Sequence, residues 1–257
     1  MVVIFLYNSR YSVKTRLMEA FVLAAGLGTR LRPLTNDRPK ALVEVDGRSL
    51  LEINLHKIIQ LGASRIVVNV HHFGNKVIDF VNSRKWDCEI VVSDERGLLL
   101  DTGGGLKKAQ QLFKGDGPIL IHNVDILSRI DLADMISRHA ASGDLATLAV
   151  SDRKTSRYLL FDNNSKLVGW HNTGTDEHLW AGEPREEYKP LAFSGIAVIS
   201  PELANLLPEA DRPYSIIPEY IKIARNHPIG NYEHSSSDWI DVGRPETLAR
   251  ATQFTDR

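Results

Sequence analysis

Short apolar runs alternate with amphipathic segments along the first 150 residues. Each run is five or six residues long, as expected of a buried strand, and the segments between place apolar residues three and four apart. This alternation predicts an α/β fold, with a mostly parallel central sheet flanked by helices. The predicted strands are Phe21–Ala25, Arg65–Val70, Glu89–Ser93, Pro118–His122 and Leu145–Val150.

Capping residues mark several helix ends. Ser49 and Glu52 form a capping box that opens a helix, and Gly62 ends it. Asp131 is expected to cap a helix over Leu132–Ala141. Further helices are predicted over Phe73–Asn82, Gly105–Phe113 and Tyr214–Arg225, and Pro245 is placed in the first turn of a closing helix.

The pattern changes after about Ser151. Tyr158–Asp162 and Lys166–Trp170 flank a polar turn, which predicts an antiparallel hairpin. Residues 171–189 are polar and irregular, and we expect them to form a loop over a site. Two more strands are predicted, Phe193–Ser200 and Trp239–Val242.

The first seventeen residues are expected to lie outside the core. Val2–Tyr7 is apolar but far shorter than the roughly 20 residues that cross a bilayer. The segment has neither the basic region nor the small-residue cleavage site of a signal peptide. Because Met18 directly precedes the first strand, residues 1–17 are interpreted as an extension or an upstream mis-start that adds nothing to function.

Charge and cysteine content narrow the partners. A net charge of −1 gives no basis for binding nucleic acid or an anionic membrane, so an anionic small substrate would need a local group of cations. The single cysteine, Cys88, excludes an internal disulfide and fits a reducing cytoplasm. No activating motif surrounds Cys88, which favours a structural role.

A glycine-rich and cation-rich loop follows the first strand. Its sequence is Leu23-Ala24-Ala25-Gly26-Leu27-Gly28-Thr29-Arg30, continuing to Pro39-Lys40. Glycines allow backbone N–H groups to approach phosphate oxygens. Arg30, Arg32, Arg38 and Lys40 offer up to four positive charges, which complement the roughly four negative charges of a triphosphate. A dinucleotide fingerprint would need a third glycine, and a Walker loop would need Gly-Lys-Ser/Thr, and neither is present.

Two aspartates follow apolar strand residues. Asp125 comes after Asn123 and Val124 at the end of one predicted strand, and Asp241 lies in Trp239–Val242. Ligands bind at the carboxyl ends of strands in open α/β sheets, and paired carboxylates suit Mg²⁺. Taken alone, each aspartate is more typical of a turn or a helix cap than of a metal site.

These segments together resemble the sugar-1-phosphate nucleotidyltransferase family, from about Met18 to Gln253. The resemblance implies a Rossmann-like nucleotidyltransferase fold whose loop holds the triphosphate. Arg30 would bind the β- and γ-phosphates, Lys40 would neutralise charge at the reacting phosphates, and Asp125 and Asp241 would hold Mg²⁺. The family usually has glycine where this chain has Val124.

Two sets of residues bear on the recognition of the base and of the sugar. Asp101-Thr102-Gly103-Gly104-Gly105 is similar to the Glu-Thr-Gly-Gly-Gly of the N-acetylmuramate-1-phosphate uridylyltransferase branch, and its amides are expected to read the base edge; a flexible helix start is the alternative. The predicted nucleotide-binding residues are therefore Leu23, Ala24, Ala25, Gly26, Gly28, Thr29, Arg30, Asp101, Gly103 and Gly104. The predicted sugar-phosphate-binding residues are Asn123, Arg153, Lys189, Ser194 and Gly195.

The resemblance implies joining of an NTP to a sugar 1-phosphate with release of pyrophosphate. UTP with N-acetylmuramate 1-phosphate is the first expectation, and GTP with mannose or heptose 1-phosphate is the alternative. A non-catalytic nucleotide-sugar-binding subunit and a molybdopterin-type nucleotidyltransferase are rival classes. Residues 18–257 are assigned to one domain with 151–200 as its sugar-binding part, and the oligomeric state stays open.

Overall fold

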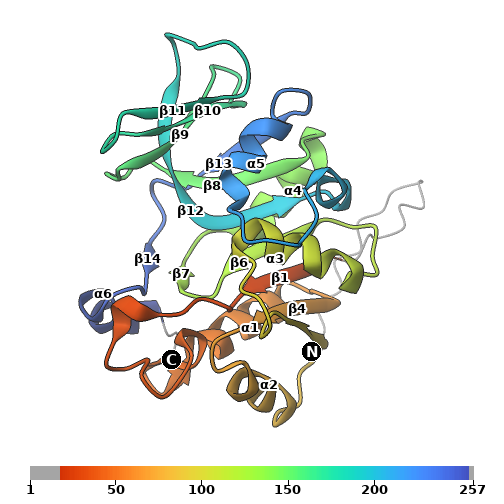
Figure 1. The fold of residues 1–257 in the computed structure, drawn as a ribbon, viewed down its shortest axis with the longest axis vertical. Helices are drawn as coiled ribbons and strands as arrows, with labels where there is room; N and C mark the ends of the chain where they lie inside the picture. Colours follow the sequence, from red (N-terminus) through yellow and green to blue (C-terminus); the bar gives the residue numbers. More distant parts are fainter. Residues whose placement is uncertain (1–17, 255–257) are drawn as a thin grey trace.

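The computed structural model describes residues 18–254, so the predicted extension at residues 1–17 lies outside the described part. Within that part, ten strands form one sheet in the order β11-β10-β9-β12-β6-β1-β4-β5, with β8 and β13 joined beside β12 (Figure 1). The strands are β1 (Glu19–Leu23), β4 (Arg65–Val70), β5 (Glu89–Asp94), β6 (Ile119–Asn123), β8 (Ala146–Ser151), β9 (Arg157–Phe161), β10 (Leu167–Asn172), β11 (Glu177–Trp180), β12 (Lys189–Ile199) and β13 (Ile229–Glu233).

The central strands β6, β1, β4 and β5 are parallel, as predicted, whereas β12 runs antiparallel to β6, β8 and β9. The chain moves outward from β1 through β4 to β5 and then returns to β6 on the other side of β1. The strand order therefore reverses between β1 and β6, where Leu23 is paired with Asn123. A reversal of this kind opens a crevice at the carboxyl ends of the two strands.

Helices cover both faces of the sheet (Figure 1). Successive residues of β1 point to opposite faces, because Ala20 and Val22 belong to one apolar cluster and Phe21 to another. Helices α1 (Leu50–Gln60), α2 (Gly74–Asn82) and α4 (Leu132–Ser142) pack on the first face, and α3 (Asp101–Ala109) and α5 (Ile216–Ile223) pack on the second. No helix within residues 18–254 is long and apolar enough to cross a membrane.

The predicted caps are confirmed. Ser49 Oγ accepts a hydrogen bond from the Glu52 amide at 3.1 Å, and Asp131 does the same for Asp134 at 2.9 Å. Two predictions were wrong. Helix α3 begins at Asp101, so the three glycines lie inside it, and residues 171–189 contain strand β11, which pairs with β10.

Shorter elements complete the chain. They are β2 (Glu44–Val45), β3 (Arg48–Ser49), β7 (Ile126–Ser128), β14 (Trp239–Asp241) and α6 (Pro245–Arg250), with 3₁₀ turns at Thr29–Leu31, Lys40–Leu42, Gln110–Leu112, Pro201–Leu206 and Ala251–Phe254. Pro245 is in the first turn of α6, as predicted. Strand β14 pairs with β7, which follows β6, so the last strand returns to the crevice.

Candidate active site

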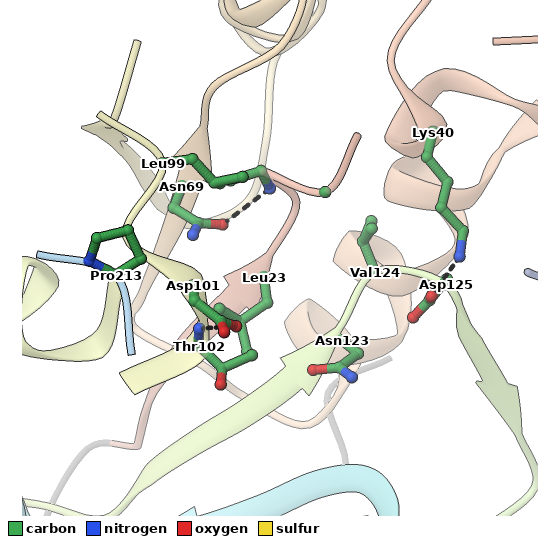
Figure 2. Close-up of a pocket in the computed structure, with 12 residues that line it drawn as sticks. Leu23, Lys40, Asn69, Leu99, Asp101, Thr102, Asn123, Val124, Asp125 and Pro213 are labelled. Atoms are coloured by element: carbon green, nitrogen blue, oxygen red, sulfur yellow. Dashed lines mark hydrogen bonds and ion pairs between the residues drawn. The ribbon is translucent and has the colours of Figure 1, made fainter. Parts of the chain in front are cut away.

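A cavity of about 510 Å³ opens at the carboxyl ends of β1 and β6, where the strand order reverses (Figure 2). Residues far apart in the sequence meet there, from the loop after β1 to the segment before α5. The lining residues are Leu23, Ala25, Gly26, Lys40, Asn69, Leu99, Asp101, Thr102, Asn123, Val124, Asp125 and Pro213.

The loop after β1 folds back on itself. Gly28 has a φ of 66°, and a Cβ there would lie 3.0 Å from both Lys40 Cβ and Thr35 Cγ2. Thr35 Oγ1 also donates a hydrogen bond to the Gly28 carbonyl at 2.8 Å. A Cβ on Gly26 would meet no atom within 4 Å among residues 18–254, apart from its two neighbours in the chain. Gly28 is therefore needed to close the loop, whereas Gly26 leaves open space that faces the cavity.

Asn69 fixes the start of this loop. Its Oδ1 accepts hydrogen bonds from the amides of Ala24 and Ala25, at 2.6 and 3.2 Å; Figure 2 shows the second of these. Its Nδ2 donates to Glu95 Oε1 at 2.8 Å, and Glu95 Oε2 accepts from the Leu100 amide at 3.1 Å. Burial raises the pKa of Glu95 above its ordinary value. The Ala24 and Ala25 amides are thus engaged by the protein. Ala25 lines the cavity, whereas Ala24 is buried behind it and is not among the lining residues.

Lys40, Asp125 and Asp241 form a charged cluster beside the cavity. Lys40 is buried, and its Nζ donates to Asp125 Oδ2 and lies 3.9 Å from Asp241 Oδ1 (Figure 2 shows the first pair). Burial raises the pKa of Asp241, helped by the negative charge of Asp125 and opposed by Lys40 and Arg30. Asp241 Oδ1 is buried with no hydrogen-bond partner among the described residues. This unsatisfied oxygen and the neighbouring carboxylate are hard ligands that fit Mg²⁺.

A third apolar cluster holds the loop after β1 and the segment around β14 together at this site. It includes Leu31, which is fully buried between exposed Arg30 and Arg32, and Ile240 and Val242 on either side of Asp241. Burying these alternate residues leaves the polar ones between them to face the site.

Arg30 consequently lies at the Asp241 side of the site rather than in the cavity wall. A Cβ on Gly243 would lie 3.0 Å from Arg30 Nη2 and 2.6 Å from Asp241 Oδ1. Gly243 therefore allows the guanidinium and the carboxylate to approach the same stretch of backbone. Thr29 is exposed in the same turn.

On the β12 side, four of the five predicted sugar-phosphate-binding residues come together. Arg153 Nη2 donates to the Phe193 carbonyl at 2.6 Å, and its guanidinium lies 4.4 Å from the centre of the Trp239 ring. Trp239 Nε1 donates to the Ser194 carbonyl at 2.9 Å. Gly195 has a φ of 74°, and a Cβ there would be 2.9 Å from the side-chain nitrogen Nδ2 of Asn123.

Some polar groups of this side are left without partners. Arg153 Nε and His234 Nδ1 are buried with no hydrogen-bond partner among residues 18–254, while His234 Nε2 shares a hydrogen bond with Ser194 Oγ at 2.7 Å. Burial lowers the pKa of Arg153 and of His234. Unsatisfied buried donors are costly, so a substrate that supplies acceptors would be stabilised here.

Lys189 is placed elsewhere. It is exposed at the start of β12, where its Nζ donates to Glu233 Oε2 at 2.6 Å, and it does not line the cavity.

The glycines of α3 serve packing in this structure. The Gly103 and Gly104 amides both donate to the Tyr214 carbonyl, at 2.9 and 3.4 Å, so they do not face a base as expected. A Cβ on Gly103 would lie 2.4 Å from the Tyr214 ring. Asp101 does line the cavity, with a φ of 59° and its carboxylate accepting from the Thr102 amide at 2.6 Å.

Several lining residues were missed from the sequence. Asn69 had a detectable signal, because it is a polar residue inside the apolar run Arg65–Val70. Leu99 and Pro213 had none. The segment that carries Pro213 is held at the cavity by hydrogen bonds to a distant part of the chain, such as the one that the Ile216 amide donates to Thr102 Oγ1 at 2.9 Å. Such contacts between distant segments leave no local pattern.

Comparison with known proteins gives consistent matches. A family model described as nucleotidyl transferase matches residues 19–167. The N-acetylmuramate alpha-1-phosphate uridylyltransferase of Caulobacter vibrioides is 34% identical over 239 residues, covering 90% of this chain and 94% of that protein. The enzyme of the same name from Neisseria meningitidis serogroup B is 29% identical, with coverage of 88% and 93%. The crystal structure of HddC from Yersinia pseudotuberculosis complexed with GMP-PN superposes with a TM-score of 0.69 at 19% identity, covering 91% of this chain and 98% of that one, and shares the fold.

Proposed function

Because the chain belongs to the nucleotidyl transferase family, we propose that it transfers the uridylyl group of UTP to N-acetylmuramate 1-phosphate and releases pyrophosphate. The predicted reaction class, a sugar-1-phosphate nucleotidyltransferase, agrees with these relatives. The observation that carries the proposal is the Lys40–Asp125–Asp241 cluster, which has the cavity on one side and Arg153 on the other.

The proposed chemistry is an in-line displacement. An oxygen of the sugar 1-phosphate attacks the α-phosphorus of the nucleotide, a new P–O bond forms, and the bond to the bridging oxygen of the pyrophosphate breaks. The attacking phosphate is already ionised, so no side chain must act as nucleophile or base. Catalysis then depends on positioning and on neutralising charge.

The cationic residues have distinct roles in this proposal. Lys40, fixed by burial, neutralises charge at the α-phosphate, and the more exposed Arg30 takes the departing phosphates. Asp125 and Asp241 would hold Mg²⁺, which supplies further charge neutralisation to the triphosphate. In the absence of substrate, the positive charge of Lys40 offsets the repulsion between Asp125 and Asp241, so the two carboxylates can stay close together.

The nucleoside is assigned to the cavity wall opposite this cluster. Leu23, Leu99 and Pro213 provide apolar surface for a planar base, and Asp101 and Thr102 provide polar groups at its edge. Gly26 leaves room for close approach to the backbone, and Gly28 and Thr29 shape the turn that leads to Arg30. Gly103 and Gly104 contribute by letting Tyr214 pack against α3.

Arg153 supports an acidic sugar as the acceptor. N-acetylmuramate differs from N-acetylglucosamine by a lactyl ether that carries a carboxylate, and a half-buried guanidinium with an unpartnered Nε suits that group. Asn123, Ser194 and Gly195 line the same side. Lys189 is engaged by Glu233, and we leave it out of the proposed site.

A substrate panel tests the proposal. Purified protein with Mg²⁺ is given each of UTP, GTP, CTP, dTTP and ATP with N-acetylmuramate, N-acetylglucosamine, glucose, mannose or heptose 1-phosphate, and pyrophosphate is measured. We expect the highest kcat/KM for UTP with N-acetylmuramate 1-phosphate. A maximum for GTP with mannose or heptose 1-phosphate would favour the guanylyltransferase alternative. Nucleotide binding without pyrophosphate from any pair would favour a binding subunit.

We also propose that the reaction takes place in the cytoplasm, in the supply of activated sugars for the cell envelope. The lone Cys88 is half-buried, and burial raises the pKa of its thiol, consistent with an unreactive residue in a reducing compartment.

A further inference from the structure

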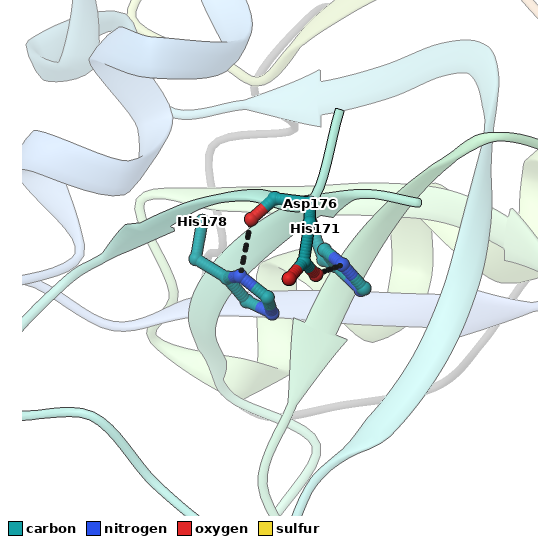
Figure 3. Close-up of side chains that lie close together, drawn as sticks. All are labelled: His171, Asp176 and His178. Atoms are coloured by element: carbon teal, nitrogen blue, oxygen red, sulfur yellow. Dashed lines mark hydrogen bonds and ion pairs between the residues drawn. The ribbon is translucent and has the colours of Figure 1, made fainter. Parts of the chain in front are cut away.

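The hairpin formed by β10 and β11 carries two histidines and an aspartate on one side (Figure 3). His171 and His178 are directly opposite each other in the antiparallel pair, so their side chains share a face of the hairpin. Asp176 lies in the turn between the strands, with a φ of 55°, and its side chain reaches back to His171. The hairpin is separated from β6 by β9 and β12, so this group is distinct from the charged cluster of the active site.

Each of the three side chains offers a ligand atom close to those of the other two. One potential ligand atom from each residue lies within 4.8 Å of the other two. Ligands of a tetrahedral zinc ion, bound at about 2.0 to 2.1 Å, lie roughly 3.4 Å apart. Because the two imidazole rings are stacked nearly parallel with centres 3.8 Å apart, both histidine side chains and the exposed Asp176 carboxylate would have to rotate for their ligand atoms to converge on one ion.

A hydrogen bond favours one tautomer of the His178 ring. His178 Nδ1 donates to the Asp176 carbonyl at 3.2 Å, which leaves the lone pair on Nε2. Metal-binding histidines commonly have this arrangement, with the second ring nitrogen donating to a carbonyl or carboxylate. His171 Nε2 donates to Asp176 Oδ1 at 3.1 Å, so in the apo state a proton occupies the position between them that a cation would take.

Stacking holds the rings in place. The His171 and His178 rings are stacked with centres 3.8 Å apart, and Trp180 continues the stack at 5.7 Å from His178 with planes 7° apart. The edge of Tyr188 packs against Trp180. The His178 ring therefore lies between two aromatic neighbours in the apo structure, and the stack would open when both imidazoles bind one ion.

A simple ion pair does not account for the whole arrangement. The Asp176 side chain is 87% exposed, and an exposed pair of this kind adds about 1 kcal/mol at most. Such a pair also explains only His171 and not the second imidazole beside it. We propose that His171, Asp176 and His178 bind a divalent transition-metal ion, with Zn²⁺ as the best fit and water in the fourth position. Imidazole ligands favour zinc over Mg²⁺, so the two metal sites of the protein would differ in selectivity.

Titration of the intact, untagged protein with ZnCl₂ tests this site. We expect one equivalent to bind in a buffer containing Mg²⁺, and His178→Ala and Asp176→Asn each to weaken it at least about 10-fold, the lower bound seen even for outer-shell partners. His227→Ala is the matched control, because His227 is an exposed histidine outside the hairpin. Circular dichroism of each variant checks that the fold is kept.

Cobalt gives a second readout that separates ligation from folding. Co²⁺ bound by imidazole nitrogens absorbs in the visible range, and this absorbance should be lost in His171→Ala and His178→Ala but kept in His227→Ala. Zinc affinity and cobalt absorbance that are unchanged in both hairpin histidine variants would overturn the proposal. Failure of the wild-type protein to bind Zn²⁺ at concentrations equal to its own, in the tens of micromolar, would do the same.

Discussion

Two carboxylates and one lysine set the chemistry at the scale of single residues. Asp125 and Asp241 lie on either side of Lys40, and the pKa of Asp241 is raised by burial and by Asp125. We predict that Asp125→Asn and Asp241→Asn each lower kcat by at least about two orders of magnitude, because each removes charge needed to hold Mg²⁺ against the phosphates. Pyrophosphate release under saturating substrates measures the effect.

Asp238→Asn is the control for these two variants. Asp238 is exposed and lies within 4 Å of Arg129, outside the cavity, so turnover should stay within about twofold of wild type. Near-normal turnover of the Asp125→Asn variant would contradict the assignment of Asp125 as a metal ligand.

Arg153 is predicted to select the sugar. Arg153→Gln should keep the hydrogen bond to the Phe193 carbonyl while losing the positive charge. The preference for N-acetylmuramate over N-acetylglucosamine 1-phosphate, as a ratio of kcat/KM values, should fall by about 10-fold or more, since a charge-assisted pair contributes roughly 1.5 to 3 kcal/mol. A general fold defect would lower both values together, and an unchanged ratio would exclude Arg153 from carboxylate recognition.

His122 should make stability depend on pH. It is fully buried in β6, and burial, aided by the positive charge of Lys57, lowers its pKa to about 3. The contribution of His122 to the free energy of unfolding is complete above the pKa of about 6.5 that this histidine has in the unfolded chain. It is lost as the pH falls toward 3, because the histidine then takes up a proton in the unfolded chain and not in the folded protein. Between pH 7 and pH 5 this amounts to about 2 kcal/mol of unfolding free energy.

Urea unfolding of wild type and His122→Leu across pH 5 to 7 measures this term. The variant should show a shallower decline, with some slope left from His139 and His234, whose pKa values are also lowered by burial. Equal slopes in the two proteins would show that His122 does not titrate on unfolding.

At the scale of elements, local chemistry predicted most boundaries. The capped helix after Ser49 and the strand Arg65–Val70 were found as predicted, because a cap and an apolar run are encoded in adjacent residues. Helix α3 was misplaced because its glycines have poor helix propensity, and their contact with Tyr214 overrides it. Strand β11 was missed because it is a polar strand at the sheet edge, stabilised by a ring stack that period-two patterns do not report.

Gly103→Ala tests this account of α3. A Cβ would lie 2.4 Å from the Tyr214 ring and 3.0 Å from its carbonyl oxygen, so the segment before α5 must shift. We expect a loss of about 1 to 3 kcal/mol in unfolding free energy and a higher KM for the nucleotide, because Pro213 moves with Tyr214. In a helix with free space at this position, the same change would raise the unfolding free energy by up to about 1 kcal/mol.

Gly97→Ala provides the comparison in denaturant unfolding. A Cβ on Gly97 would meet no other part of residues 18–254 within 4 Å. The unfolding free energy of the Gly97→Ala variant should therefore stay within about 0.5 kcal/mol of wild type. A stabilised Gly103→Ala protein with normal KM would contradict the packing role.

At the scale of the whole molecule, the site is an assembly of distant segments. Leu31, Leu127 and Ile240 pack in one apolar cluster, which brings the loop after β1 to the strand that ends at Asp241. The residue types at Lys40, Asp125 and Asp241 were predictable from motifs. Asn69 could be noticed as a polar residue in an apolar run, but its hydrogen bonds to the loop after β1 could not be predicted, and Pro213 carried no signal, because both depend on how distant parts of the chain pack.

Assembly of the site from two segments that lie far apart in the sequence predicts that nucleotide binding stabilises the entire fold. A ligand at 100 times its Kd adds about 2.7 kcal/mol, which for a protein of this size corresponds to a Tm increase of roughly 5 to 10 °C. We expect UTP with Mg²⁺ to give the largest increase among the five nucleotides in a thermal unfolding assay. Adding EDTA should remove most of the increase, because the triphosphate would then face two uncompensated carboxylates. Substituting Asp241→Asn should do the same, because the triphosphate would then lose its metal. An equal increase with and without Mg²⁺ would mean that the nucleotide binds through the cations alone, with Asp125 and Asp241 taking no part.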